Sequence, residues 1–250
     1  MQPWTCWVAS DVLAFEGVTR VLGSGAGVFD LTFRLEPGEI VAVVGLNGAG
    51  KTTLMRLALG MLRPDEGTVR LGGRPLAELP TRTWARVGKL IEVPLAYPEL
   101  TVRKNLQITR LLHRAQPETV HRAIETWQLE PVAERRVRRL SLGTRQRVGL
   151  AAALQHDPRL IVLDEPSNAL DPAAVIRLRE QLLRRARAGA AVLVSSHHLD
   201  EVARTADRVL LMNRGRLIGP LDATGPDLER ALFEHIRADD ERRCVPEEMR

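Results

Sequence analysis

The stretch that decides the fold runs from Ile40 to Thr52 and reads Ile-Val-Ala-Val-Val-Gly-Leu-Asn-Gly-Ala-Gly-Lys-Thr. Its first five residues are apolar and mostly β-branched, which predicts a strand buried on both faces of a parallel sheet. The next eight match Gly-x-x-x-x-Gly-Lys-Thr, the pattern of a phosphate-binding loop, and residues 52–62 have helical periodicity. The order strand, loop, helix therefore predicts a nucleoside triphosphate site in an α/β sheet.

The chemistry of this loop follows from its residue types. Its glycines let successive backbone N–H groups point at phosphate oxygens, and the helix N-terminus adds partial positive charge. Lys51 supplies a cation for the β- and γ-phosphates, and the Thr52 hydroxyl is placed to bind Mg²⁺. The expected phosphate-binding residues are Gly45, Leu46, Asn47, Gly48, Ala49, Gly50, Lys51, Thr52 and Thr53.

A second segment, residues 160–166, reads Leu-Ile-Val-Leu-Asp-Glu-Pro. Its apolar run predicts another buried strand, which ends in two carboxylates at the edge of the sheet where α/β proteins bind ligands. Asp164 would hold Mg²⁺, and Glu165 would polarise the attacking water as a base. An Asp-Glu pair after a strand can also be a plain loop or helix cap, but the phosphate loop favours the catalytic interpretation.

A third segment, residues 140–147, reads Leu-Ser-Leu-Gly-Thr-Arg-Gln-Arg and precedes a helix predicted over residues 148–155. Ser141 and Gly143 would offer a hydroxyl and unobstructed amides to a phosphate. The alternative is that Ser141 simply caps a helix, and the residues taken alone favour the cap.

The rest of the chain predicts an α/β core with an antiparallel layer in front and a helical insertion. Further buried strands are expected over residues 160–163 and 191–194, with a helix over residues 172–188 between them, capped by Asp171. Residues 209–218 predict a hairpin, residues 12–19, 27–35 and 68–71 predict antiparallel strands, and residues 94–139 are helical and poor in strands.

Composition excludes several classes of protein. The chain has 250 residues, of which 44% are hydrophobic and 27% charged, as is typical of soluble globular proteins. We expect a cytosolic chain, because no apolar run approaches the roughly 20 residues of a membrane helix and the start does not resemble a signal peptide. Cys6 and Cys244 lack metal-binding spacing and predict reduced thiols. The net charge of +5 comes from basic residues spread over the chain, which indicates solvated helix faces more than nucleic-acid binding.

Together these segments resemble the ATP-binding-cassette (ABC) transporter ATPases. Residues 45–53 resemble the Walker A loop, 160–166 the Walker B strand, 140–147 the LSGGQ signature and 167–171 the D-loop. Residues 195–197 resemble the switch-histidine loop, so the resemblance gives His197 the contact to the γ-phosphate. The implied fold is a P-loop NTPase, with an ABC ATPase domain over residues 10–222, a helical insertion at about 94–139, and a short C-terminal helix and tail over 223–250.

The resemblance implies a mechanism and partners. ATP and Mg²⁺ would be the cofactors, and two nucleotide-binding domains, as a homodimer or heterodimer, would sandwich ATP between the Walker A loop of one and the signature of the other. A separately encoded membrane permease would be the other partner, and would hold the ATPase at the inner face of the cell membrane. No nucleic acid is expected.

Four departures from the family pattern refine this expectation. The signature carries Leu142 and Thr144 in place of glycine and glutamine, and the D-loop carries Asn168-Ala169. Glu92 stands where the Q-loop glutamine is usual, which resembles ATPases of bacitracin export and lantibiotic immunity, and it inherits the contact to Mg²⁺. Leu22 replaces the aromatic residue expected to stack on adenine.

We therefore expect an ATP-hydrolysing subunit that powers export of a drug, an antibiotic peptide or a related substrate. The alternative is a soluble, non-transport ABC ATPase that acts on nucleic acid or the ribosome. Such relatives usually carry two cassettes or long coiled-coil insertions, and this sequence has neither.

Overall fold

The computed structural model describes residues 12–23, 25–92, 96–197, 199–222 and 227–244. Within them, a six-stranded sheet has the order β10-β9-β3-β8-β7-β6. Strands β6 to β9 and β3 run parallel, and β10 pairs antiparallel with β9. Their bounds are β3 Ile40–Val44, β6 Val87–Leu90, β7 Leu160–Leu163, β8 Ala191–Ser195, β9 Arg208–Asn213 and β10 Arg216–Leu221. The predicted parallel core is confirmed.

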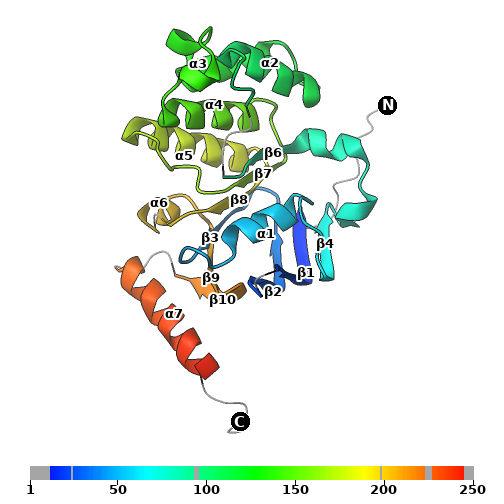
Figure 1. Cartoon of the computed structure of the whole chain (residues 1–250), viewed down its shortest axis with the longest axis vertical. Coiled ribbons are helices and arrows are strands. Elements are labelled where there is room, and N and C mark those ends of the chain that lie inside the picture. Colours follow the sequence, from blue (N-terminus) through cyan, green and yellow to red (C-terminus); the bar gives the residue numbers. More distant parts are fainter. Residues whose placement is uncertain (1–11, 24, 93–95, 198, 223–226, 245–250) are drawn as a thin grey trace.

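A second, antiparallel sheet of four described strands has the order β2-β1-β4-β5 and confirms the predicted front layer. The two sheets enclose an apolar core together with the first helix, on the side of the parallel sheet away from the helical insertion (Figure 1). The strands are β1 Leu13–Val21, β2 Gly27–Leu35, β4 Glu66–Leu71 and β5 Arg74–Pro75.

The central strand β3 shows why the apolar runs are continuous. Ile40, Ala42 and Val44 belong to a core that also contains residues of the helical insertion, whereas Val41 and Val43 belong to the core beneath the antiparallel sheet. Because side chains alternate between the two faces of a strand, a sheet covered on both sides needs apolar residues at every position.

The helices cover both faces of the parallel sheet (Figure 1). Helices α2 and α3 form the end of the molecule farthest from α7, and α4 and α5 lie between them and the sheet. The helices are α1 Lys51–Ala58, α2 Val102–Leu112, α3 Glu118–Thr126, α4 Leu142–Leu154, α5 Pro172–Arg187, α6 Leu199–Ala203 and α7 Leu228–Cys244; the 3₁₀ helices are η2 Leu76–Glu78, η3 Thr81–Arg86, η4 Glu130–Val132 and η5 Val137–Arg139.

The boundaries of α5 confirm the capping prediction. Asp171 accepts a hydrogen bond from the backbone N–H of Ala174 at 2.8 Å, Pro172 is the first helical residue, and Gly189 follows the end with φ of +90°. An acceptor at the N-cap satisfies a free N–H, and glycine adopts the left-handed conformation that ends many helices.

Three helix boundaries differ from the sequence predictions. Helix α4 begins at Leu142, as the cap interpretation of Ser141 predicts, and not at 148, because the glycine and polar residues after Ser141 are helical. Helix α1 ends at Ala58, where Leu59 leaves helical geometry, short of the predicted 62. The C-terminal helix α7 continues to Cys244 and is longer than the short helix expected.

Candidate nucleotide-binding and catalytic site

Three adjacent strands place the predicted site residues at one edge of the parallel sheet. The phosphate loop follows β3, the switch segment follows β8, and the Asp-Glu pair follows β7, in the spatial order β3-β8-β7. Carboxyl ends of parallel strands meet at one edge, which is where α/β proteins bind ligands. The sheet therefore brings together three segments that are far apart in the sequence.

The phosphate loop is shaped by its glycines and by close contact with β9. Gly45 has φ of +157°, and a Cβ there would lie 2.2 Å from the Met212 carbonyl oxygen, so no other residue fits without movement. Gly50 has φ of +106°, a conformation that favours glycine. The buried Lys51 folds back and donates from Nζ to the Gly45 carbonyl oxygen at 2.8 Å. A bound phosphate would therefore compete with this carbonyl for the ammonium.

Two of the three expected Mg²⁺ ligands, Thr52 and Asp164, already touch. The Thr52 hydroxyl donates to Asp164 Oδ2 at 2.7 Å, and the Ser195 hydroxyl donates to Asp164 Oδ1 at 2.5 Å. Asp164 is only 5% exposed, so both of its carboxylate oxygens are fixed in a buried setting. Hydroxyl and carboxylate oxygens are hard donors of the kind that Mg²⁺ prefers, and the residues present fit that ion.

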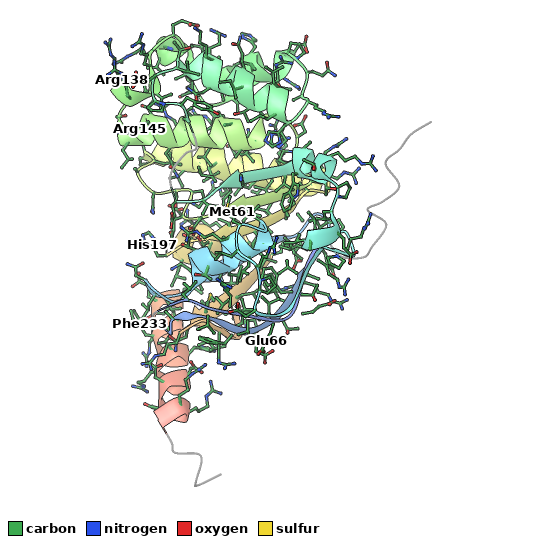
Figure 2. All side chains as sticks on the ribbon, turned by 45° about the vertical axis from the view of Figure 1, so that its right-hand side comes forward. Met61, Glu66, Arg138, Arg145, His197 and Phe233 are labelled. Carbon is green, nitrogen blue, oxygen red and sulfur yellow. The ribbon has the colours of Figure 1, made fainter. Side chains whose placement is uncertain are left out.

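Glu165 is held from three directions. Its backbone N–H donates to Ser195 Oγ at 2.9 Å, and its φ is +47°. One carboxylate oxygen lies 3.7 Å from Lys51 Nζ, and the other lies 2.7 Å from His197 Nδ1. The structure thus brings together Lys51, Glu165 and His197, the three residues for which catalytic roles are expected. Figure 2 shows His197 on the surface of the molecule, between the region of α4 that carries Arg145 and the helix that carries Phe233.

The signature segment forms the first turn of α4. The Ser141 hydroxyl accepts from the backbone N–H of Thr144 at 3.3 Å, so this serine is a helix cap. A Cβ on Gly143 would lie 2.4 Å from the Ala169 carbonyl oxygen, and Gln146 donates to the Pro166 carbonyl oxygen at 3.0 Å. The signature helix is therefore packed against the loop that follows Glu165.

Glu92 and Leu22 lie away from this network of bonds. Glu92 has φ of +56° and forms an ion pair with Arg56 of α1, with 2.7 Å between Oε1 and the guanidinium. The Leu22 backbone N–H donates to the Ala26 carbonyl oxygen at 2.7 Å, in the connection between β1 and β2.

Two residues of the site were not assigned from the sequence. Ser195 bonds both Asp164 and the backbone of Glu165, and its signal was its position at the end of the strand beside β7. Arg56 holds Glu92, but nothing in the sequence links positions 36 residues apart on a helix and a loop.

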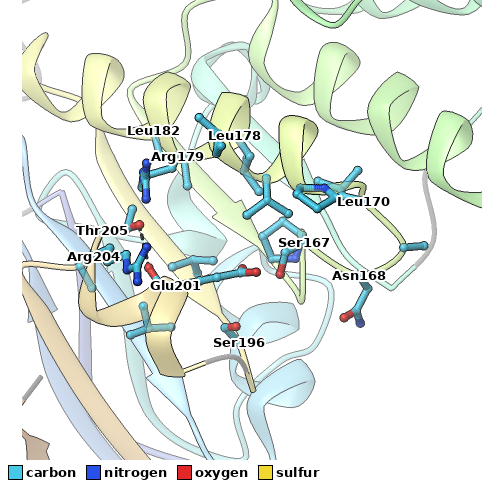
Figure 3. A pocket seen from close by; sticks show the side chains of 18 residues that line it. Ser167, Asn168, Leu170, Leu178, Arg179, Leu182, Ser196, Glu201, Arg204 and Thr205 are labelled. Carbon is cyan, nitrogen blue, oxygen red and sulfur yellow. Dashed lines mark hydrogen bonds between the residues drawn. The ribbon is translucent and has the colours of Figure 1, made fainter. Parts of the chain in front are cut away.

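A cavity of about 620 Å³ lies next to the site, between α5, α6 and the segment that follows Glu165 (Figure 3). Its lining includes Ser167 and Ser196 as well as Leu178 and Leu182 of α5. Lys51, Asp164 and Glu165 do not line this cavity, so it is separate from the phosphate-binding edge.

The sequence profile described as ABC transporter matches residues 28–168, which is more than half of the chain. The chain belongs to the ABC transporter family. As a member it is the ATP-binding subunit of a transporter and a transport-coupled ATPase. ATPase domains of this family dimerise and act with separate permeases.

Similar proteins include ATP-binding proteins of bacterial ABC transporters. An uncharacterised ABC transporter ATP-binding protein, YhcH of Bacillus subtilis, is 36% identical over 92% of this chain and 73% of its own length. The bacitracin transport ATP-binding protein BcrA of Bacillus licheniformis is 31% identical over 91% of this chain and 72% of its own length. Nod factor export ATP-binding protein I of Paraburkholderia xenovorans is 36% identical over 82% of this chain and 69% of its own length.

Solved structures agree with this assignment. The ATP-binding subunit of an ABC transporter superposes with a TM-score of 0.82 at 27% identity, covering 90% of this chain and 99% of that one. A dimeric ATP-binding cassette with ADP and phosphate bound has a TM-score of 0.78 at 21% identity. The match covers 85% of this chain and 99% of that one, and it supports the fold. Among the described helices of this ABC ATPase, none combines the length and apolar character needed to cross a membrane.

Proposed function

We propose that this ABC ATPase uses ATP and Mg²⁺ to power export of a drug, an antibiotic peptide or a related substrate through a separate permease. The observation that carries its catalytic part is the connected set of bonds from Thr52 through Asp164 and Ser195 to Glu165. This set joins the phosphate loop to the expected base, within the cassette domain over residues 10–222.

Mg²⁺ would be held by Thr52 and Asp164, and when bound it stabilises negative charge on the phosphate oxygens. Lys51 leaves the Gly45 carbonyl oxygen to bind the β- and γ-phosphates, and the loop N–H groups contact the same phosphates. Leu22 offers little stacking to the base, so the phosphates provide most of the binding free energy.

Glu165 acts as the general base and accepts a proton from the attacking water on a carboxylate oxygen. His197 orients that carboxylate through the 2.7 Å contact from Nδ1, and its backbone N–H donates to the same oxygen at 3.2 Å. Ser195 fixes the backbone of Glu165, so the base keeps its position while the proton moves. Fixed geometry of this kind contributes to catalysis by reducing reorganisation.

The active assembly is a pair of cassettes, either two copies or this chain with a related one. Ser141 and Gly143 belong to a helix start that packs against the chain's own D-loop, and Leu142 between them is exposed. This exposed helix N-terminus, with its partial positive charge, is available to cover the γ-phosphate bound by the other cassette.

The permease docks over α2 and the end of α1, and keeps the ATPase at the cytoplasmic face of the membrane. Leu111 and Leu112 of α2 are 62% and 72% exposed, and Met61 beyond α1 is also exposed. Leu112 and Trp84 line a cavity of about 550 Å³ at this place. Tyr97, which precedes α2, is exposed as well. Exposed apolar side chains beside a hollow are typical of protein interfaces.

The relatives support the class of substrate. Two of them carry bacitracin transport and Nod factor export in their names, and Glu92 is the feature of this chain that resembles the bacitracin type.

Docking is tested by Leu112→Glu, with Phe233→Glu as the matched control, because both side chains are apolar and more than half exposed. In cells that also express the permease, the Leu112 variant should be mostly absent from the membrane fraction, and these cells should lose drug resistance. The purified Leu112 variant should keep its ATPase activity. The Phe233 variant should behave as the wild type. Equal membrane recovery of both variants, or recovery without the permease, would contradict the proposed docking surface.

A further inference from the structure

The C-terminal helix α7 packs against the hairpin formed by β9 and β10. Leu232 and Ile236 are buried in the same apolar core as Leu221 of β10. Figure 1 shows α7 beside this hairpin, at the end of the molecule opposite α2 and α3. The helix therefore contacts a part of the sheet that also borders the phosphate loop.

A buried polar contact joins α7 to the end of β9. The Asn213 amide donates from Nδ2 to Asp239 Oδ2 at 2.8 Å and to Asp240 Oδ1 at 3.0 Å. Burial alone would raise the pKa of Asp239, but hydrogen bonds from Arg243 and Asn213 bring that pKa below its usual value. Asp239 is therefore an ionised acceptor at neutral pH, and such charge-assisted hydrogen bonds are stronger than neutral ones.

The turn between β9 and β10 has the geometry of a tight hairpin that needs support. Arg214 and Gly215 have φ of +44° and +80°, as in a type I′ turn. Arginine is rarely found in this left-handed region, and such positions persist when their surroundings hold them. Here the Arg214 guanidinium lies 3.1 Å from Asp240 Oδ1, so one carboxylate of α7 contacts two consecutive residues of the turn.

The opposite side of the same hairpin holds the phosphate loop. The Gly215 N–H donates to the Ala49 carbonyl oxygen at 2.8 Å. The carbonyl oxygen of Met212 lies against Gly45, and the side-chain methyl group of Met212 lies against Gly50. The hairpin therefore contacts the phosphate loop at Gly45, Ala49 and Gly50. Asp240 is linked to the loop through the turn that it contacts.

We infer that Asp240 and Asn213 are positioning residues for nucleotide binding, which act by holding the hairpin and, through it, the phosphate loop. This inference rests on the proposed role of residues 45–52 in binding phosphates. If the turn is less rigid, the N–H groups of the phosphate loop no longer point steadily at the phosphate oxygens. The binding of ATP and of ADP is then weakened to the same extent. Asp164, Glu165 and Ser195 come from other strands, so the hydrolysis step is not expected to change.

The test compares Asp240→Ala with Arg237→Ala in the full chain. Arg237 lies on the same helix and forms an exposed ion pair with Glu241 at 3.5 Å, so the control also removes one ion pair of α7. Dissociation constants for fluorescently labelled ATP and ADP are measured with Mg²⁺, together with kcat at saturating ATP. Hydrogen exchange of residues 45–52 measures the mobility of the phosphate loop directly. Binding is measured at a temperature below the lowest thermal midpoint among the variants, so that all of them are folded.

Asp240→Ala should raise both dissociation constants about three- to tenfold, leave kcat within about twofold and speed exchange in the loop. Asp240→Asn keeps one acceptor oxygen and should fall between this variant and the wild type. Lys51→Ala is the reference for the loop itself. If Lys51→Ala weakens binding while Asp240→Ala matches Arg237→Ala, the inference about α7 is wrong and the loop assignment stands. If Lys51→Ala binds like the wild type, the loop assignment also fails.

Discussion

Two neighbouring parts of the parallel sheet hold acidic residues in different ways. At the catalytic edge, formed by Asp164, Glu165, Ser195 and His197, each carboxylate has at least two partners, and the Glu165 side chain is only 20% exposed. In the β6 region, formed by β6, Glu92, His113 and His156, the Glu92 carboxylate is 53% exposed and pairs with one arginine. An exposed ion pair contributes about 0–1 kcal/mol. The catalytic carboxylates are therefore held in place without nucleotide, whereas Glu92 is free to change partners.

The largest effect is expected at the catalytic edge. Glu165→Gln keeps the shape of the side chain but removes its ability to accept a proton, so ATP binding should persist while kcat falls about 10²- to 10⁴-fold. ATP-bound dimers should accumulate, as seen by size-exclusion chromatography with ATP. Glu180→Gln on the exposed side of α5 is the control. Hydrolysis by the Glu165 variant at the wild-type rate would show that Glu165 is not the base.

The sequence predicted which residues lie together at the catalytic edge, because the signals for their positions are local. Each element is a short apolar strand followed directly by a glycine or a polar residue, as in Val44-Gly45 and Leu163-Asp164, and parallel strands align these junctions. The contact from Ser195 to Asp164 could not be predicted in the same way, because it depends on β7 and β8 being neighbours.

The β6 region was harder to predict because its contacts join distant residues. The pair of Glu92 with Arg56 depends on how α1 lies beside the end of β6. The stacked rings of His113 and His156, with centroids 3.7 Å apart, join the end of α2 to the loop after α4. For α4, the cap interpretation of Ser141 was right, but the predicted helix range began at 148, because Gly143 and the polar residues beside it resemble a loop when read alone.

The histidine pair makes the stability of the β6 region depend on pH. Burial lowers the pKa of His156 to about 3, with a further decrease from His113 and Arg185 and opposing effects from the Val87 carbonyl and Asp157. Burial also lowers the pKa of His113, and Lys89 adds to this. Between pH 6.5 and about 3, the unfolded chain thus binds more protons at His156 than the folded chain does. The free energy of unfolding should therefore fall as pH falls through this window.

The expected slope is at most about 1.4 kcal/mol per pH unit from His156 alone. His156→Gln should flatten the dependence of the thermal midpoint on pH between 4.5 and 7, relative to the wild type. His121→Gln, an exposed position on α3, should leave that dependence unchanged. Parallel midpoint curves for the wild type and the His156 variant would show that this histidine is not the source.

The smallest effect is expected at Glu92, and it measures how freely this residue changes partners. If Glu92 leaves Arg56 to reach the metal when nucleotide binds, the arginine and Mg²⁺ compete for one carboxylate. Glu92→Gln should then raise the Mg²⁺ concentration for half-maximal ATPase activity about two- to threefold, because a neutral amide attracts the cation less. Arg56→Gln should lower it by a similar factor, because Glu92 is released from its ion pair.

The control for both variants is Glu16→Gln, which removes a similar ion pair to Arg70 at 2.9 Å on the antiparallel sheet. Its Mg²⁺ curve should match the wild type, since that pair lies on a different sheet from β6. Opposite shifts in the Glu92 and Arg56 variants would mean that the ion pair withholds a metal ligand until nucleotide arrives. Identical curves for all three variants would mean that Glu92 only fixes its loop to α1 and does not reach the metal.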